Sequence, residues 1–236
     1  MARKKYVIFT AGGSGTRMGA GVPKQFLTLE GIPVLQRSIS VFLNACPDVK
    51  VVTVLPKEHF AEWKELCQKN SFEVPQLLAE GGISRFHSVK AALERVPDGA
   101  IVAIHDGVRP LVSEGLVRTM FEKMETLHAL IPVIPVTDTL KTLERASDGT
   151  LRTSSSPDPD RGHTFAAQTP QMFLSEEIRA AYTLPYDTAF TDDASVARKY
   201  GIPLSYIIGE RHNLKLTVPE DMEEARQILF SGRLCR

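Results

Sequence analysis

The sequence predicts an α/β protein with a Rossmann-like, mostly parallel sheet flanked by helices. Over the first 135 residues, short apolar runs rich in β-branched residues alternate with segments of helical periodicity, which is typical of βαβ crossovers. A glycine-rich segment directly follows the first apolar run, where such a fold places a ligand-binding loop. With 236 residues, 43% of them hydrophobic, the chain is long enough to bury a sizeable core, and we expect a single domain over residues 1–236.

Five runs are predicted to be strands covered by helices on both faces, because each is mostly apolar. They are Tyr6 to Ala11, Val49 to Leu55, Val74 to Ala79, Ala100 to His105 and Ala129 to Pro135. The segments between them carry apolar residues at helical spacing, and Ser84 and Ser113 are suited to be N-caps. The predicted crossover helices are Val34 to Ala45, Glu58 to Lys69, Ser84 to Val96 and Glu114 to His128.

The alternation of strands and helices stops after Pro135. Residues 137–161 are polar and rich in turn formers, so they contribute little to a core. They are either a surface excursion or a projecting β-arm for dimerisation, since Asp138 to Leu143 and Thr150 to Thr153 can pair as a hairpin around Asp148-Gly149. Beyond them we expect helices at Ser175 to Tyr182, Asp192 to Tyr200 and Pro219 to Phe230 and a strand at Leu204 to Ile208.

The charge of the chain is balanced, with 28 Lys and Arg against 28 Asp and Glu. No overall field therefore draws the protein to nucleic acid or to an anionic membrane, and any binding of an acidic substrate must be local. The first apolar run ends at Ala11 and is too short for a secretory core or a membrane span. Three dispersed cysteines do not suggest a disulfide framework, and we expect a cytoplasmic protein.

The most informative segment is the loop from Ala11 to Gly19. Glycines at the carboxyl end of a strand let backbone N–H groups approach a polyphosphate. The loop is not a dinucleotide fingerprint, because Met18 takes the third glycine position, nor a Walker loop, because Lys24 follows a proline. It is not a hydrolase nucleophile elbow either, since Thr16 stands where the last glycine is needed. It carries two cations, Arg17 and Lys24, which we expect to contact phosphate.

This loop, with Pro23-Lys24-Gln25-Phe26, resembles the signature of sugar-phosphate nucleotidylyltransferases and, in this form, that of the methylerythritol phosphate cytidylyltransferases. Further matching segments extend the resemblance over almost the whole chain. They are Glu80-Gly81-Gly82 with Arg85 and Ser88-Val89, His105 to Pro110, Pro135 to Lys141, Gln168 to Phe173, Thr191 to Ser195 and Asn213 to Thr217. One departure is Gly107-Val108, where the family normally has two alanines.

The resemblance implies transfer of CMP from CTP to a polyol phosphate, 2-C-methyl-D-erythritol 4-phosphate, in the non-mevalonate route to isoprenoid precursors. The products would be 4-diphosphocytidyl-2-C-methyl-D-erythritol and pyrophosphate. A phosphate monoester has a second pKa of about 6, so the attacking oxygen is already largely ionised at neutral pH. Positioned cations and Mg²⁺ would therefore supply most of the catalysis. No protein metal ligand is assigned, because the triphosphate would hold the ion.

The resemblance also implies roles for the matching residues, with Arg17, Lys24, Arg161 and Lys215 as the catalytic set. Arg17 and Lys24 would stabilise the transition state at the α-phosphate, Arg161 would bind the acceptor, and Lys215 would act as a positioning lysine. The phosphates and ribose would lie against Gly12, Gly13, Ser14, Gly15 and Thr16, cytosine would be selected by Gly82 and Ser88, and the acceptor side would involve Asp106, Arg109, Thr139 and Thr169. Thr139 and Arg161 belong to an arm, about residues 137–161, that would reach the partner's active site, which implies a homodimer with shared sites.

Two motif segments contain polar residues for which we expect a structural role. His105 closes an apolar strand and is interpreted as a hydrogen-bonded core residue. Thr191-Asp192-Asp193 precedes an apolar run and is interpreted as a helix start that favours negative charge, rather than as a metal site.

Three alternatives remain open at this level. Ribitol-5-phosphate cytidylyltransferases share the loop and the His-Asp-x-x-Arg-Pro and Thr-Pro-Gln segments, although Asp138 to Lys141 and Asp160-Arg161 favour the methylerythritol enzymes. A non-catalytic nucleotide sensor on the same fold is a more distant alternative, because fold does not determine function. The presence of both Arg17 and Lys24 argues against it, and a dehydrogenase is more distant still.

Overall fold

The computed structural model describes residues 3–13 and 23–231. Its centre is a sheet in the order β10 (Phe165–Ala167), β7 (Ala129–Pro135), β11 (Gln171–Leu174), β6 (Ala100–Asp106), β1 (Lys4–Thr10), β4 (Lys50–Leu55) and β5 (Gln76–Glu80). An eighth strand, β12 (Ser205–Ile208), pairs with β7. The neighbours β6, β1, β4 and β5 are parallel, as is β12 to β7, so the predicted α/β class with a mostly parallel sheet is confirmed.

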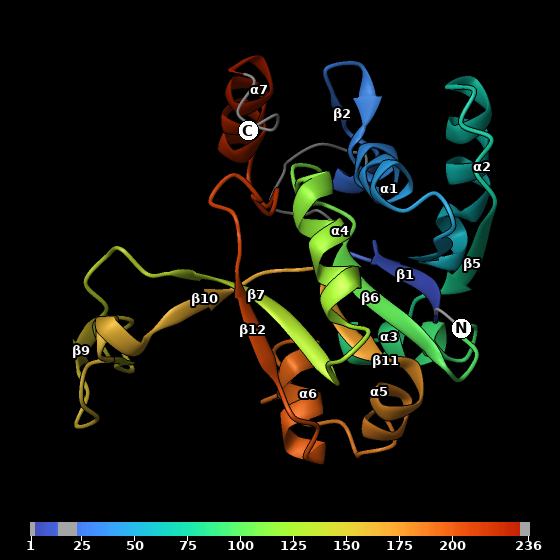
Figure 1. The fold of residues 1–236 in the computed structure, drawn as a ribbon. Helices are drawn as coiled ribbons and strands as arrows, with labels where there is room; N and C mark the ends of the chain where they lie inside the picture. Colours follow the sequence, from blue (N-terminus) through green and yellow to red (C-terminus); the bar gives the residue numbers. More distant parts are fainter. Residues whose placement is uncertain (1–2, 14–22, 232–236) are drawn as a thin grey trace.

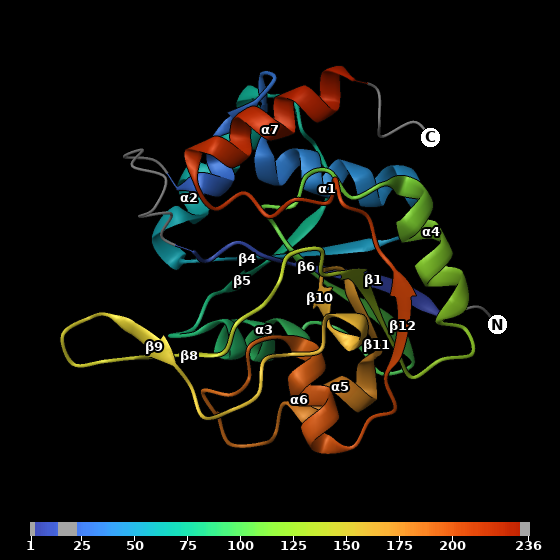
Figure 2. The same cartoon turned by 90° about the vertical axis from the view of Figure 1, so that its left-hand side faces the viewer.

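Helices cover both faces of this sheet (Figure 2). On one side lie α1 (Val34–Ala45), α2 (Phe60–Lys69), α4 (Glu114–Lys123) and α7 (Pro219–Phe230). On the other side lie α3 (Arg85–Leu93), α5 (Ser175–Ala181) and α6 (Asp193–Tyr200). Each side has its own apolar core, with Phe42 and Trp63 in one and Phe86 and Tyr182 in the other.

The predicted helix starts are largely confirmed, but two helix ends are wrong. The Ser84 and Ser113 side chains cap α3 and α4 by accepting from the backbone N–H of His87 and Leu116. Both helices end earlier than predicted, because the chain after each tightens into i→i+3 bonds, such as Val96 N to Leu93 O. The bounds of α1, α7 and β7 agree with the predictions.

Several short elements were not predicted. The strands β10 and β11 pair antiparallel with successive parts of β7, and β2 (Thr28–Leu29) pairs with β3 (Ile32–Pro33). In the described residues the chain also forms the 3₁₀ helices η2 (Lys24–Phe26), η3 (Lys57–His59) and η4 (Arg161–His163). Runs of two to four residues are too short to show a period in the sequence.

The polar stretch after β7 forms an extension that projects from the body in both ribbon views (Figures 1 and 2). Its hairpin consists of β8 (Leu143–Arg145) and β9 (Leu151–Thr153). The turn contains Gly149 in a left-handed conformation and an Asp148 side chain that accepts from the N–H of Thr150. A hairpin around Asp148-Gly149 is confirmed, but the predicted position of its first strand is wrong, because β8 shares only Leu143 with the predicted Asp138 to Leu143.

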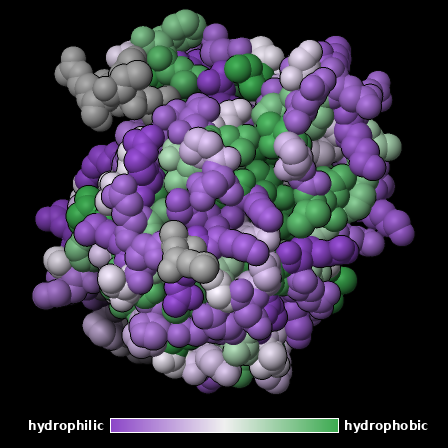
Figure 3. All heavy atoms as spheres, turned by 45° about the vertical axis from the view of Figure 1, so that its right-hand side comes forward, coloured by the Kyte–Doolittle hydropathy of each residue, from purple (hydrophilic) through white to green (hydrophobic). Residues whose placement is uncertain are grey.

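Hydrophilic side chains cover most of the face seen in Figure 3, with apolar atoms gathered in a patch right of its centre. No helix in the described part of the chain is long and apolar enough to cross a membrane. Cys46 and Cys67 are both free thiols.

Candidate active site

The site follows from the connectivity of the parallel strands. β1 lies between β4 and β6, and the chain runs from β1 to β4 and only later returns to β6. The carboxyl ends of β1 and β6 are paired, with Thr10 opposite Asp106. Open α/β sheets bind ligands in the crevice at such a point, and a cavity of about 270 Å³ lies here.

Many of the residues predicted for the site line this cavity. The lining consists of Thr10, Ala11, Gly12, Gly13, Lys24, Gln25, Gly82, Ile83, Ser84, Arg85, Ser88, Asp106, Val108 and Lys215. Four predicted residues, Ser14, Gly15, Thr16 and Arg17, lie outside the described part of the chain. The lining residues come from segments up to about 200 positions apart in the sequence, and the strand ends bring them together.

The start of the glycine-rich loop is tied to the segment that follows it. Gln25 is 1% exposed, and its Nε2 donates to the carbonyl of Ala11 over 2.6 Å. The side chain of Lys24 runs beside Gly13, since its Cε would lie 3.7 Å from a Cβ built on that glycine. The loop and its lysine are therefore held together. The role of Gln25 is not predictable from the sequence, because a side-chain bond to a backbone carbonyl leaves no sequence pattern.

On the β5 side, Gly82 and Ser88 form one hydrogen-bonded unit. The backbone N–H of Gly82 donates to Ser88 Oγ over 3.0 Å, and the Ser88 hydroxyl donates to the carbonyl of Ser84 over 2.9 Å. A Cβ on Gly82 would lie 2.4 Å from the Cβ of His87, closer than real atoms approach. This turn therefore requires glycine at position 82.

Asp106 is the carboxylate of the cavity, and three cations surround it. Its Oδ2 lies 3.1 Å from Lys215 Nζ and 3.2 Å from Arg109 Nε, and its Oδ1 lies 3.7 Å from Arg85 Nε. Burial acts to raise the pKa of Asp106, but the charges of Arg85, Lys215 and Arg109 outweigh it and lower that pKa well below its ordinary value. Asp106 is ionised at neutral pH, and the three positive charges around it outnumber its single negative charge.

A buried layer supports Asp106 from behind. Thr169 Oγ1 accepts from the Asp106 backbone N–H and lies 3.0 Å from His105 Nδ1, and Arg109 Nη1 donates to the carbonyl of Asn213. Burial is the main cause that lowers the pKa of His105 to about 4, so this histidine is neutral. The structural role expected for His105 is confirmed. Arg109 and Thr169 contact the Asp106 segment and do not line the cavity.

Arg85 connects the cavity to α6. Its Nη1 and Nη2 donate to the two oxygens of Asp193 over 2.8 and 2.6 Å, and Tyr182 Oη donates to the same carboxylate over 2.5 Å. Asp192 caps α6 by accepting from the N–H of Ser195, so the predicted helix start is confirmed. The ion pair with Arg85 was not predicted, because 108 positions separate the partners.

Thr139 and Arg161 lie on the projecting extension and are exposed. Arg161 Nη1 donates to the carbonyl of Thr137 over 3.2 Å. Neither residue lines the cavity of its own chain.

The family model for IspD, 2-C-methyl-D-erythritol 4-phosphate cytidylyltransferase, matches residues 6–231. The chain belongs to this family. A relative of that name from Porphyromonas gingivalis is 44% identical over 98% of this chain and 100% of its own. Another from Bacteroides fragilis is 38% identical over 94% of this chain and 98% of its own. The crystal structure of the Thermus thermophilus enzyme of that name has a TM-score of 0.70 at 28% identity, over 96% of this chain and 98% of that one.

Family membership confirms the resemblance seen in the motifs, and the structure shows the surroundings of the departure at Gly107. A Cβ on Gly107 would lie 2.8 Å from Leu35 Cδ1 and 3.2 Å from the Cβ of Ala11. The nearest of these atoms is the end of a side chain, so an alanine here would require Leu35 to shift. The N–H of Gly107 donates to the carbonyl of Thr10. The loop keeps its connection to the end of β1.

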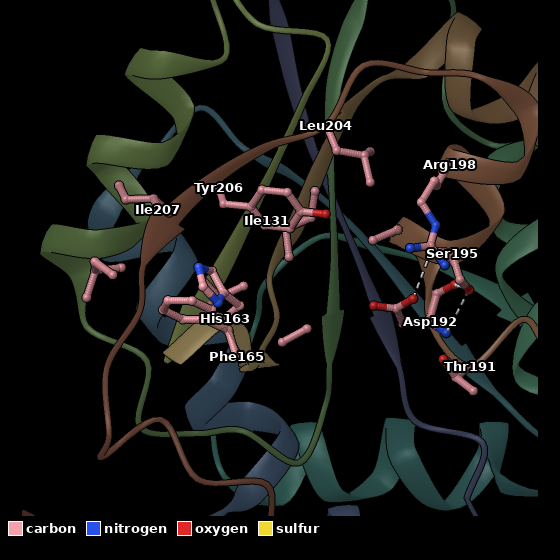
Figure 4. A pocket seen from close by; sticks show the side chains of 14 residues that line it. Ile131, His163, Phe165, Thr191, Asp192, Ser195, Arg198, Leu204, Tyr206 and Ile207 are labelled. Carbon is pink, nitrogen blue, oxygen red and sulfur yellow. Dashed lines mark hydrogen bonds between the residues drawn. The ribbon is translucent and has the colours of Figure 1, made fainter. Parts of the chain in front are cut away.

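A second, larger cavity of about 710 Å³ lies beside β7, β10, β12 and α6. Figure 4 shows Phe165 and Tyr206 on one side of it and, on the other, Ser195 and Arg198 of α6 with Asp192, the N-cap of that helix. None of the residues predicted for nucleotide or acceptor binding lines it. The smaller cavity, with its glycines and cations, is therefore the candidate active site.

A group of three or more His, Cys, Asp or Glu side chains suited to hold a metal is absent from residues 3–13 and 23–231. Asp106, the carboxylate on the lining of the smaller cavity, is already engaged by cations. Mg²⁺ commonly binds proteins through one or two carboxylates together with substrate phosphates, so an ion at this lining would take most of its ligands from a bound phosphate group.

Proposed function

We propose that this cavity transfers the CMP group of CTP to 2-C-methyl-D-erythritol 4-phosphate, giving 4-diphosphocytidyl-2-C-methyl-D-erythritol and pyrophosphate for isoprenoid precursor synthesis. The observation that carries the proposal is the set of cations, Lys24, Arg85 and Lys215, on the lining of a cavity at the carboxyl ends of β1 and β6. The family and the names of its members support the reaction. Nothing among these relatives favours the ribitol phosphate alternative or a nucleotide sensor.

The chemistry is an in-line displacement at the α-phosphorus. An oxygen of the acceptor's phosphate forms a bond to this phosphorus as the bond to the β-phosphate oxygen breaks, and the electron pair leaves with pyrophosphate. No proton has to be removed, because the attacking phosphate is already largely ionised at neutral pH. The obstacle is the repulsion between two polyanions, which positioned cations reduce. Lys24 and Arg17 take this role at the α-phosphate in our proposal.

The nucleotide lies along the glycine-rich loop in this account. Gly12 and Gly13 are exposed at the end of β1, and the phosphates and ribose lie against them and against the following Ser14, Gly15 and Thr16. Gly82 and Ser88 select cytosine. Their mutual hydrogen bond supports this role, because it fixes the turn whose backbone faces the base.

The acceptor lies at the Asp106 end of the cavity. Lys215 positions its phosphate, since the lysine side chain is 42% exposed and its amine is held 3.1 Å from Asp106. Arg109 and Thr169 act on the acceptor through Asp106, which both residues hold in place. The partner subunit contributes the remaining contacts in this proposal.

We further propose a homodimer in which Thr139 and Arg161 of each extension reach the active site of the partner. Two observations support it. The extension, about residues 137–161, is almost entirely exposed, and large apolar side chains near its base are exposed too, with Phe165 at 47%, Tyr206 at 58% and Ile208 at 66%. A second copy packed against this surface would remove these side chains from water.

Members of this family use a divalent metal, and we propose that the ion here is Mg²⁺ bound to the triphosphate. When bound, it neutralises part of the charge that develops on the leaving pyrophosphate. The chain's own contribution is to present Lys24 and Lys215 on the lining of the cavity. Because the reaction consumes CTP, we place the enzyme in the cytoplasm, where CTP is made.

The test is pyrophosphate release from CTP and Mg²⁺ with 2-C-methyl-D-erythritol 4-phosphate and, in parallel, with ribitol 5-phosphate. We expect turnover with the first acceptor and at most a trace with the second. A preference for ribitol 5-phosphate would overturn the proposed acceptor but leave the reaction type intact. Nucleotide binding without pyrophosphate release on either acceptor would support the sensor alternative.

A further inference from the structure

Arg85 is fixed from behind by groups that lie outside the cavity. Its guanidinium makes two bonds to Asp193, a carboxylate that is 0% exposed and that also accepts from the buried Tyr182. Gln171 fixes the start of α6, which carries Asp193, by donating to Asp192 and accepting from the N–H of Ala194. A bidentate pair of this kind sets both the position and the plane of the guanidinium.

The Nε edge of the same guanidinium lies toward the active site. Arg85 lines the cavity, its side chain is 30% exposed, and its Nε lies 3.7 Å from Asp106 Oδ1. Asp106 is thus held on two sides, because its Oδ2 faces Lys215 and Arg109. The chain of contacts runs from α6 through Asp193, Arg85 and Asp106 to Lys215.

We propose that Arg85 is a positioning residue for CMP transfer, which holds Asp106 from the side opposite Lys215 and so directs the lysine ammonium to the acceptor. The inference rests on the proposed function. Without the charge of Arg85, the attraction of Asp106 to Lys215 and Arg109 is no longer balanced from the α3 side. Asp106 then moves toward the lysine, and the ammonium is drawn away from the acceptor's phosphate.

A purely structural role is the competing explanation, since the pair also joins α3 to α6. Removing Arg85 alone would confuse the two, because it leaves a buried carboxylate without its partner. The double variant Arg85→Gln/Asp193→Asn avoids this problem: it removes both charges and keeps side chains that can hydrogen-bond to each other and to Tyr182. A control for the chemical change itself is Arg179→Gln/Asp98→Asn, which makes the same changes in a more exposed ion pair between α5 and the segment after α3, away from the cavity.

The experiment measures kcat, KM for both substrates and the thermal midpoint. We expect the Arg85/Asp193 variant to keep a thermal midpoint close to that of the control pair but to lose at least about tenfold in kcat. A displacement of a positioned group by about 1 Å can lower the rate up to 10²-fold. The same double change in an Asp106→Asn background should cost less than about twofold more, because residues that act through one group are not additive.

Two results would overturn the inference: a kcat within about twofold of the control pair, or losses that multiply fully with Asp106→Asn. If the double variant does not fold, Arg85→Lys takes its place, because a lysine keeps the charge but cannot make two bonds to Asp193 and still reach Asp106. A wild-type kcat in Arg85→Lys would equally contradict the inference. If the wild-type protein transfers no CMP at all, the proposed function fails first; if it does, these variants test the inference alone.

Discussion

The substitution Gly82→Ala tests the nucleotide side of the site, and its matched control is the neighbouring Gly81→Ala. A Cβ at position 82 would lie 2.4 Å from the Cβ of His87 and 3.1 Å from its backbone carbon, whereas at position 81 the nearest atoms are 3.5 Å away. Ordinary contact begins at 3.4 Å, so the turn at position 82 must shift by about 1 Å, which can cost up to 10²-fold in rate. His87 cannot rotate away, because the clash involves its Cβ and backbone.

The same shift breaks the hydrogen bond from the Gly82 N–H to Ser88 Oγ, which contributes about 1 kcal/mol, or a factor of about 5. We therefore expect kcat/KM for CTP to fall between about 5-fold and 100-fold in Gly82→Ala. In Gly81→Ala the change should stay within about twofold, because only ordinary contacts form. Pyrophosphate release at varied CTP and saturating acceptor measures both variants. Equal values for the two would refute the role of this turn in binding the nucleotide.

Two further predictions concern the buried histidine and the dimer. The pKa of His105 is lowered from 6.5 to about 4 in the folded protein, so the unfolded chain takes up the proton first as the pH falls. The folded protein therefore loses stability between pH 6.5 and pH 4. From pH 7 to pH 5 the free energy of unfolding falls by about 2 kcal/mol because of this group. Urea unfolding should show this loss in the wild type and not in His105→Gln, and equal losses in both would contradict it. If the extension supplies Arg161 to the partner, mixing inactive Lys24→Ala with inactive Arg161→Ala should restore about a quarter of the wild-type activity after subunit exchange. Half of the dimers then contain one of each variant, and one of their two sites is complete. A mixture that stays inactive would mean that each chain uses its own arginine.

Much of the central fold could be predicted because its strands are buried on both faces. β7 is a continuous apolar run, and its predicted bounds agree with the structure. Strands at the edge of the sheet such as β10, whose residues are all exposed, show no such apolar run. Their pairing with β7 depends on tertiary contacts, which override weak local propensity.

The active site was predictable where its residues follow strand ends. Gly12 and Gly13 follow β1, Gly82 follows β5, and Asp106 ends β6, so the topology brings them to one edge of the sheet. The ion pair between Arg85 and Asp193 was not predictable, since both residues appear as ordinary charges near helix starts. Only the packing of α3 against α5 and α6 shows that one guanidinium joins a buried carboxylate to Asp106.

The most direct test of the central claim, that the smaller cavity carries out CMP transfer, is a comparison of Lys24→Ala with Lys57→Ala. Lys24 lines the cavity, whereas Lys57 is an exposed lysine outside it. Pyrophosphate release should fall on the order of 100-fold in kcat for Lys24→Ala and stay at the wild-type value for Lys57→Ala, with unchanged circular dichroism for both. A wild-type kcat in Lys24→Ala would contradict the account, because transfer would then not depend on the cation that this cavity presents.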